Sequence, residues 1–151
     1  MIYRKAVGVL LLNPENKIFV GARLDLPGTS FQPPQGGIDG DETPREAVYR
    51  ETLEEIGTNN MEILKESLDW FQYDFPEELR TTLFKGNCIG QKQKWFVARF
   101  LGQDHEINIE TADPEFKAWK WENPALLVQQ AVYFKQKMYS EILAWANFTT
   151  T

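Results

Sequence analysis

Cysteine and histidine are each used once in this chain of 151 residues, and long apolar runs are missing. Cys88 alone can form no disulfide within the chain, which fits a reducing compartment such as the cytosol. His105 alone excludes a metal site built from several histidines and weakens any case for a Ser-His-Asp triad. The apolar run at 7–12 is too short to span a bilayer. We therefore expect a cytoplasmic protein that makes no membrane contact.

Positive charge is also scarce, because 16 lysines and arginines stand against 22 aspartates and glutamates and leave a net charge of −6. This balance argues against broad, nonspecific binding to nucleic acid, but it allows a local basic groove or a metal-bridged phosphate contact. A hydrophobic content of 42% predicts a globular chain. No repeat, low-complexity tract or linker divides the sequence, so we expect one monomeric domain over residues 1–151.

The stretch at 35–58 opens with a glycine loop and continues as a well-marked helix. Thr43 is the expected N-cap, Pro44 takes the first helical position, and Glu46 completes a capping box. Gly57 supplies the C-terminal stop. The pattern therefore predicts a helix that begins at Pro44 and ends at Gly57.

Three glutamates, Glu51, Glu54 and Glu55, share one arc of this helix. Like charges three or four residues apart cost roughly 0.2–0.5 kcal/mol per pair, so the arc requires an explanation. Closely packed oxygen ligands suit a hard divalent cation such as Mg2+ or Mn2+. The backbone at Gly36 and Gly37 can approach a substrate phosphate without a Cβ in the way. On the residues alone, a solvated glutamate-rich helix explains the arc as well.

The spacing around the arc resembles the Nudix box. Gly36 is followed after five residues by Glu42, and after seven more by the run RETLEEIG at 50–57. This resemblance implies an α/β protein with the Nudix fold, an α/β/α sandwich with a mixed sheet and a long C-terminal helix. It also implies metal-dependent hydrolysis of a nucleoside diphosphate linked to another group, with Mg2+ or Mn2+ as cofactor. Thr52 departs from the pattern, which prefers an aliphatic residue, and is expected on the packed side.

The same resemblance assigns roles to individual residues of the box. Glu51 and Glu55 become metal ligands, with Glu54 and Gly36 close by. Arg50 takes an orienting role through a salt bridge to a neighbouring glutamate. Glu54 is the first candidate for the carboxylate that accepts a proton from the attacking water. The implied catalytic residues are Glu54, Glu51 and Arg50.

A second motif, rich in lysine, lies at 91–100 and predicts a strand. Strict alternation puts Gln91 and Trp95 on one side of this strand and Lys92 and Lys94 on the other. The lysines form either a solvated strand face or a pair of cations that reach substrate phosphates. The residues alone leave both interpretations open.

Further strands are expected at 6–12, 17–23, 67–73 and 117–121, with a loop at 24–32. Asn123 and Pro124 are expected to start the last helix. The apolar stripe of this helix consists of Leu127, Ala131, Phe134, Met138, Ile142 and Trp145. For Phe134, in the middle of the stripe, burial is the default interpretation.

Several segments outside the box resemble one group of the Nudix family, the bacterial RNA 5′ pyrophosphohydrolases, which are close kin of the dinucleoside polyphosphate hydrolases. These segments are residues 3–4, 34–38, 90–96, 114–116 and 133–135. The resemblance makes Glu115 a further metal ligand and places Lys92 and Lys94 near the phosphates. It also places Arg4 near the RNA and Phe134 against a base, while Gly37 belongs to the glycine loop that meets the phosphates.

The implied reaction removes pyrophosphate or phosphate from 5′-triphosphorylated or diphosphorylated RNA, leaves a 5′-monophosphate and promotes mRNA decay. Two other functions stay open. A hydrolase of diadenosine tetraphosphate would use the same box and the same metals. A Nudix-fold nucleotide-binding module without catalysis usually loses box glutamates, whereas Glu51, Glu54 and Glu55 are all present here.

Overall fold

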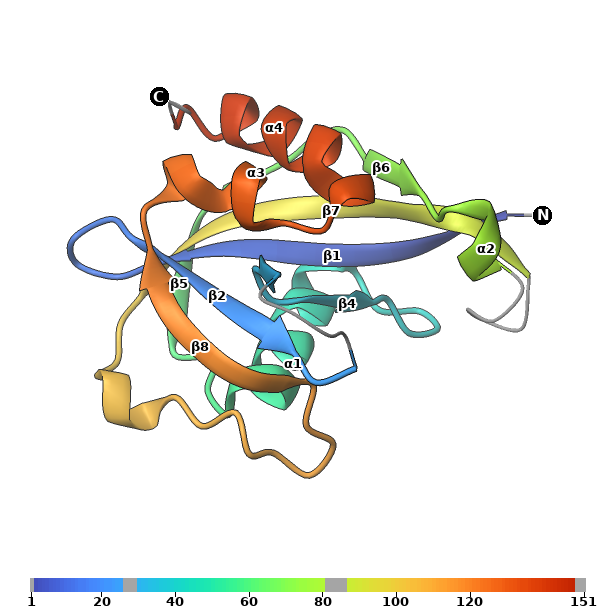
Figure 1. Ribbon diagram of the computed structural model, residues 1–151. Helices are drawn as coiled ribbons and strands as arrows, with labels where there is room; N and C mark the ends of the chain where they lie inside the picture. Colours follow the sequence, from blue (N-terminus) through green and yellow to red (C-terminus); the bar gives the residue numbers. More distant parts are fainter. Residues whose placement is uncertain (1, 26–29, 81–86, 149–151) are drawn as a thin grey trace.

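The computed structural model describes residues 2–25, 30–80 and 87–148 (Figure 1). Its strands are β1 (Ile2–Leu12), β2 (Ile18–Arg23), β3 (Phe31–Gln32), β4 (Gln35–Gly37), β5 (Met61–Glu66), β6 (Phe71–Asp74), β7 (Cys88–Phe100) and β8 (Phe116–Glu122). The strands expected at 6–12, 17–23, 91–100 and 117–121 are therefore confirmed. β1 and β7 start earlier than expected, because they continue to pair with each other through polar residues.

The strands form one mixed sheet in which the main order is β3-β2-β1-β7-β5. β1 and β7 run parallel along their whole length, and the other described pairs are antiparallel. On its other edge, β1 pairs with β4 at residues 6–8 and with β2 at Leu12. This edge of β1 is thus divided between two partner strands, and the candidate site lies at the resulting fork.

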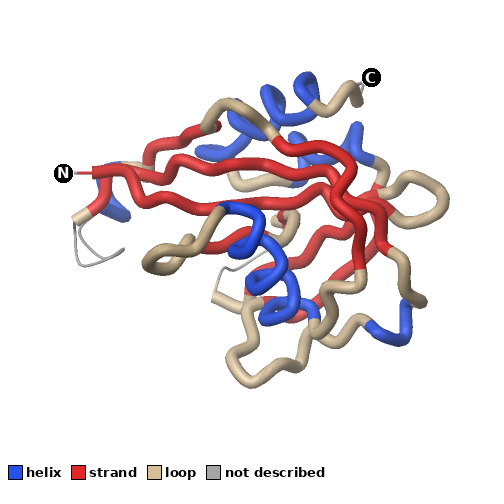
Figure 2. Tube along the Cα trace, turned by 180° about the vertical axis from the view of Figure 1, so that it is seen from behind, coloured by secondary structure: helices blue, strands red, loops and turns tan. Residues whose placement is uncertain are grey.

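The helices are α1 (Pro44–Ile56), α2 (Glu77–Arg80), α3 (Leu127–Gln130) and α4 (Gln136–Trp145), with 3₁₀ turns at Asp104–Glu106, Pro124–Leu126 and Tyr133–Lys135. α3 and α4 cover one face of the β1–β7 pair, and α1 covers the other (Figures 1 and 2). Alternate residues of β1 supply the two cores, since Val7, Val9 and Leu11 pack with α1 while Leu10 and Leu12 pack with α3 and α4. This arrangement confirms the α/β/α sandwich.

α1 begins and ends where the sequence predicts. The Thr43 hydroxyl accepts a hydrogen bond from the Glu46 amide at 3.1 Å, and the Glu46 carboxylate accepts one from the Thr43 amide at 2.9 Å. Gly57 closes the helix in the left-handed region, at φ 78°. Thr52 is buried as expected, and its hydroxyl donates to the Val48 carbonyl at 2.7 Å. This bond satisfies the hydroxyl inside the core.

The strand expected at 67–73 is wrong over its first four residues. β5 ends at Glu66 and β6 begins at Phe71. Between them the chain bends, and the Ser67 hydroxyl donates to the Asp69 carbonyl at 2.9 Å. The aromatic residues of this segment favour a strand, but a local bond from a serine side chain to the backbone competes with sheet pairing.

The last helix is not continuous from Asn123, although Asn123 does cap the first turn. Ala131 and Val132 are extended, with ψ of 154° and 141°, and they interrupt the helix before α4. The Gln136 side-chain amide donates to the Ala131 carbonyl at 3.3 Å, which satisfies a backbone group freed by the break. The expected apolar stripe nevertheless faces the core at Leu127, Met138 and Ile142.

The loop expected at 24–32 falls partly outside the described residues, at 26–29, and its last two residues form β3. His105 is exposed and Cys88 is buried without a disulfide partner. In the described ranges, no helix combines the length and the apolar character that crossing a membrane requires.

We predict that Thr43→Ala lowers the free energy of unfolding by about 1 kcal/mol, because it removes the acceptor of the Glu46 amide. Thr43→Ser keeps a hydroxyl at the cap and is expected to lose less than about half as much. Urea denaturation of both variants in chelator measures the difference. Equal losses in the two variants would contradict a stabilising capping box.

Candidate functional site

Two cavities meet where α1 faces the fork of β1, and both are lined by Glu51 and Glu115. The first, about 260 Å3, carries three positive side chains, those of Arg4, Arg23 and Lys135. We call it the cationic pocket. The second, about 440 Å3, carries five carboxylates, those of Glu51, Glu54, Glu55, Asp113 and Glu115. We call it the acidic pocket. Opposite charges are thus gathered on the two sides of Glu51.

Gly36 and Gly37 of β4 allow charged side chains to approach the backbone between the two pockets. A Cβ at Gly36 would overlap the Glu51 carboxylate, and a Cβ at Gly37 would overlap the Arg4 guanidinium. Successive strand residues face opposite sides, so the two glycines admit an anion on one face of β4 and a cation on the other. Glycine is required at both positions for this close approach.

Arg50 organises the acidic side of the site. Its Nε donates to Glu42 at 2.6 Å, and its Nη1 donates to Glu51 at 3.0 Å and Glu54 at 3.1 Å. Its Nη2 donates to the Gly37 carbonyl at 2.8 Å. The hydrogen bond from Arg50 lowers the pKa of Glu42 to about 2, and the same bond raises the pKa of Arg50. Glu42 is therefore held as an anion that fixes the guanidinium.

Glu55 is the most deeply buried carboxylate of the acidic pocket. It is 1% exposed, its Oε2 accepts a hydrogen bond from the Gln35 amide at 3.2 Å, and its Oε1 has no partner. Burial, with Glu115 and Glu51 nearby, raises the pKa of Glu55 well above its ordinary value. Burial also raises the pKa of Glu51. A divalent cation fits this arrangement, because it would satisfy the orphaned oxygen and offset the repulsion among the carboxylates.

As the side chains stand, no three His, Cys, Asp or Glu residues of the described ranges form a group that would hold a metal. Arg50 binds Glu51, and Glu54 is turned outward with a side chain that is 58% exposed. The residues whose surroundings fit a divalent cation are therefore Glu55 and Glu51, with Glu115 beside them. Glu54 lines the same acidic pocket from its outer side.

Lys135 is a buried cation of the cationic pocket that was not predicted as a site residue from the sequence. Its ammonium donates to the side-chain oxygens of Gln32 and Gln35 at 3.2 and 3.1 Å and lies 5.1 Å from the centre of the Tyr73 ring. Burial, with Arg23 nearby, lowers the pKa of Lys135 to about 7. The available signal was its place on the apolar face of the last helical region, where a lysine needs a polar partner.

A chain of buried amides lies beside the cationic pocket. Gln93 Nε2 donates to Gln35 Oε1 at 3.1 Å and to Gln91 Oε1 at 2.8 Å, and the Trp95 indole donates to Gln93 Oε1 at 2.8 Å. Gln35 Nε2 in turn donates to the Tyr139 hydroxyl at 2.8 Å. The predicted alternation along β7 is confirmed here, and glutamines on its core-facing side were the signal for a polar site.

Lys92 and Lys94 do not line either pocket. They lie on the α1 side of the sheet, whereas Gln91, on the opposite side of β7, lines the cationic pocket. The Lys94 ammonium donates to the Ser67 and Leu68 carbonyls at 3.3 and 2.6 Å, so it holds the bend between β5 and β6. The predicted contact of these two lysines with substrate phosphates stays a prediction.

Phe134 is half-buried and packs against the core beneath α4. Its ring centre lies 5.9 Å from that of Tyr73, which lines the cationic pocket. Phe134 itself is not among the residues that line this pocket. Its predicted contact with a base remains a prediction.

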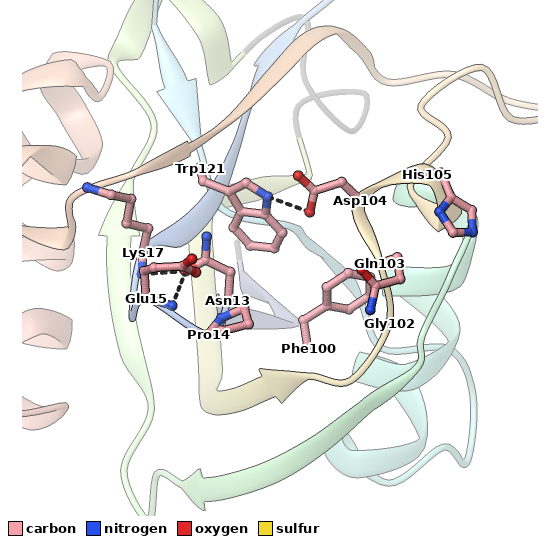
Figure 3. A pocket seen from close by; sticks show the side chains of 10 residues that line it. All are labelled: Asn13, Pro14, Glu15, Lys17, Phe100, Gly102, Gln103, Asp104, His105 and Trp121. Atoms are coloured by element: carbon pink, nitrogen blue, oxygen red, sulfur yellow. Dashed lines mark hydrogen bonds between the residues drawn. The ribbon is translucent and has the colours of Figure 1, made fainter.

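A third cavity of about 680 Å3 lies beside the β1–β2 turn and is formed around Phe100 and Trp121 (Figure 3). The two ring centres are 5.9 Å apart, and the Trp121 indole donates to Asp104 at 3.0 Å. None of the site residues predicted from the sequence lines this cavity, so it is separate from the candidate site.

A family model described as NUDIX domain matches residues 2–144. A Rhodospirillum rubrum protein named RNA pyrophosphohydrolase is 49% identical over 142 residues, which cover 94% of this chain and 86% of that protein. A Rickettsia prowazekii protein of the same name is 47% identical over 141 residues, which cover 93% and 88%.

Two solved structures share the fold at low sequence identity. The E. coli dihydroneopterin triphosphate pyrophosphohydrolase matches with a TM-score of 0.70 at 14% identity, covering 95% of this chain and 99% of that one. A C. elegans Ap4A hydrolase complex matches with a TM-score of 0.66 at 18% identity, covering 95% and 98%.

We predict that Glu55→Gln raises the melting temperature of the metal-free protein at pH 7 by about 2–4 °C. Because folding raises the pKa of Glu55, the folded state binds more protons than the unfolded state. Wild-type stability therefore falls as the pH rises above the ordinary value of 4.5. The variant has no ionisable group at this position, so its stability does not decrease in this way as the pH rises. Thermal melts in chelator from pH 4.5 to neutrality measure it.

Excess Mn2+ provides the second half of this test. It is expected to raise the melting temperature of wild type and to have much less effect on Glu55→Gln. Glu54→Gln is the matched control, because it removes one charge from the same helix at an exposed side chain, and its metal-free melting temperature should change less. A Glu55→Gln protein that melts lower in chelator and responds normally to Mn2+ would contradict the assignment of Glu55.

Proposed function

Because the chain belongs to the Nudix family, we propose that it is a pyrophosphohydrolase that acts on the 5′-triphosphate end of RNA. The observation that carries this proposal is the junction of the cationic and acidic pockets at Glu51 and Glu115. An RNA end is a polyanion that needs positive side chains along its phosphates and a carboxylate-held metal at the bond that breaks. The two relatives named RNA pyrophosphohydrolase add support.

In this proposal the cationic pocket receives the phosphates and first nucleotides of the RNA. Arg4, Arg23 and Lys135 supply positive charge, and the missing side chain of Gly37 lets the Arg4 guanidinium lie against β4. Phe134 is proposed to contact a base, since stacking on an aromatic ring is largely independent of sequence. The pocket thus recognises an RNA end mainly through charge.

The acidic pocket is proposed to hold Mg2+, or Mn2+ in its place, through Glu51, Glu55 and Glu115 beside Gly36. A divalent cation bound there supplies charge neutralisation and a more acidic water. Glu54, held by Arg50 at 3.1 Å and open to the same pocket, accepts the proton from the water that attacks phosphorus. The phosphoanhydride bond then breaks, and the RNA keeps a 5′-monophosphate once pyrophosphate, or phosphate in two successive steps, has left.

A dinucleoside polyphosphate is the second candidate substrate, because it presents the same kind of phosphate chain, between two nucleosides, to the same two pockets. We also propose that the enzyme works as a cytoplasmic monomer of one domain, and the single mixed sheet formed by the described strands supports one domain. Gel filtration tests the oligomeric state.

We predict that release of pyrophosphate or phosphate from triphosphorylated RNA requires Mg2+, stops in chelator and is faster than hydrolysis of diadenosine tetraphosphate. Glu55→Gln is expected to lower kcat at least about 100-fold, because it removes a carboxylate from the proposed metal site. Initial rates on both substrates measure these effects. Faster hydrolysis of diadenosine tetraphosphate would favour the second candidate, and no turnover of either with Mg2+ or Mn2+ would favour a binding module.

A further inference from the structure

We infer that the protein has a second RNA contact, on the sheet face opposite the cationic pocket, that binds the nucleotides following the 5′ end. The inference rests on the proposed function. The contact consists of Lys5, Lys92 and Lys94 together with the rings of Tyr3 and Trp70. We call this surface the lysine–aromatic face.

The three lysines and two rings form one continuous surface on the α1 side of the sheet. Lys5 of β1 and Lys92 of β7 are register partners, so their side chains lie side by side. The Lys5 and Lys94 ammonium groups lie 5.6 and 5.4 Å from the centre of the Trp70 ring. The Lys92 ammonium lies 6.0 Å from the centre of the Tyr3 ring. Cations and aromatic faces therefore alternate across the surface.

The positive charge of this surface has no carboxylate partner within the described part of the protein, although the Lys94 ammonium also donates to the Ser67 and Leu68 carbonyls. No carboxylate there lies within 4.0 Å of the ammonium groups of Lys5, Lys92 or Lys94. Like charges directly opposite each other in a sheet are destabilising, and the chain as a whole has a net charge of −6. A local group of unneutralised lysines in an acidic protein points to an anionic ligand.

The surface is open and partly preformed. α1 packs on β1 from Val7 onward, and the N-terminal ends of β1 and β7 project past α1 (Figure 2). Trp70 is 37% exposed, and Lys94 fixes the bend that carries it by donating to the Leu68 carbonyl. An exposed ring held in place needs to lose little conformational freedom when a base stacks on it.

A short route connects the cationic pocket to this surface. β4 pairs with β1 up to Ala6, and the Ile38 amide then donates to the Lys5 carbonyl at 3.1 Å. Beyond Lys5, no strand of the described ranges pairs with this edge of β1. Arg4 lines the pocket and Lys5, the next residue, faces the other side. An RNA strand that leaves the pocket therefore crosses one strand edge to reach the lysine–aromatic face.

Single-stranded RNA fits this surface better than an acidic protein does. Positive side chains beside exposed aromatic rings bind single strands with little dependence on sequence, since phosphates meet the cations and bases stack on the rings. An acidic protein surface would use the lysines and leave the tryptophan without a role. The substrate of the adjoining site supplies such a strand.

The test compares hydrolysis of a triphosphorylated dinucleotide with that of a triphosphorylated single-stranded RNA of about twelve nucleotides. Wild type is expected to have the higher kcat/KM on the longer RNA, through a lower KM. In Lys5→Ala/Trp70→Ala this advantage should shrink at least about fivefold. Lys5→Arg should keep it, and so should Lys17→Ala, a control that removes the same charge in the β1–β2 turn.

Fluorescence anisotropy with a 5′-hydroxyl RNA of the same length gives a second measurement that needs no turnover. The double variant should bind more weakly, and the slope of log Kd against log salt should fall by about 0.7 for the lost lysine. Circular dichroism checks folding, and if the double variant is unfolded, Lys5→Ala and Trp70→Leu are compared singly. Each should then show part of the same loss.

Equal length dependence in wild type and the variants, or none in wild type, overturns the inference and leaves the proposed function standing. Unchanged RNA binding would also overturn it and would leave an acidic protein as the partner of this surface. Absence of turnover on both RNAs would instead overturn the proposed function. In that case the anisotropy measurement still decides whether the lysine–aromatic face binds RNA.

Discussion

The guanidinium of Arg50 is the group on which the geometry of the site depends, because it joins three parts of the chain that differ in structure. It binds the Gly37 carbonyl in β4, Glu42 in the loop before α1, and both Glu51 and Glu54 within α1. Several charge-assisted bonds share one ordered side chain, so each costs less entropy than it would in an isolated surface pair. β4 and α1 are therefore held at a fixed separation.

Arg50 neutralises the outer carboxylates and leaves the inner one unpaired. The Glu55 carboxylate accepts a hydrogen bond from the Gln35 amide through Oε2, its Oε1 has no partner, and Glu51 and Glu115 are close. Such a group destabilises the metal-free fold when it is ionised, whereas a glutamine of the same shape would bury no charge and would not be repelled by Glu51 and Glu115. The strong local signals of α1 explain how this is tolerated, because its capping box and its glycine stop stabilise the helix independently of the site. Binding of a cation then converts the repulsion into affinity.

How far the sequence predicts this structure depends on the range of the interactions. α1 is predicted to the residue, because its cap, its proline and its glycine act within one turn. The bend at 67–70 depends on side-chain bonds from Ser67 and Lys94 to the backbone, which no periodicity reveals. Lys135 and the buried glutamines depend on contacts between distant parts of the chain, such as those of Gln35 with Gln93, 58 positions away, and with Lys135, 100 positions away. Spacing along the chain places these side chains on a core-facing side but does not identify their partners.

The lysines of β7 show a second kind of limit. Alternation correctly separates Lys92 and Lys94 from Gln91, but it does not say which face of the strand lines the cationic pocket. The position of α1 decides this, because α1 packs on the side of the sheet that carries the lysines, and the cationic pocket lies on the opposite side. The glutamines, and not the lysines, consequently reach the cationic pocket.

Under the proposed function, the charges of the site determine where the 5′ end of an RNA binds. The cationic pocket attracts the phosphates, and the carboxylates of the acidic pocket repel them as long as no cation is bound. Under the proposed function, a divalent cation held by Glu51, Glu55 and Glu115 would reverse the sign of the field at the shared wall of the two pockets. The terminal phosphates of the proposed substrate would then be attracted past Glu51, while the rest of the strand would stay with the arginines and Lys135. RNA binding and metal binding are therefore expected to strengthen each other, because each neutralises charge that opposes the other.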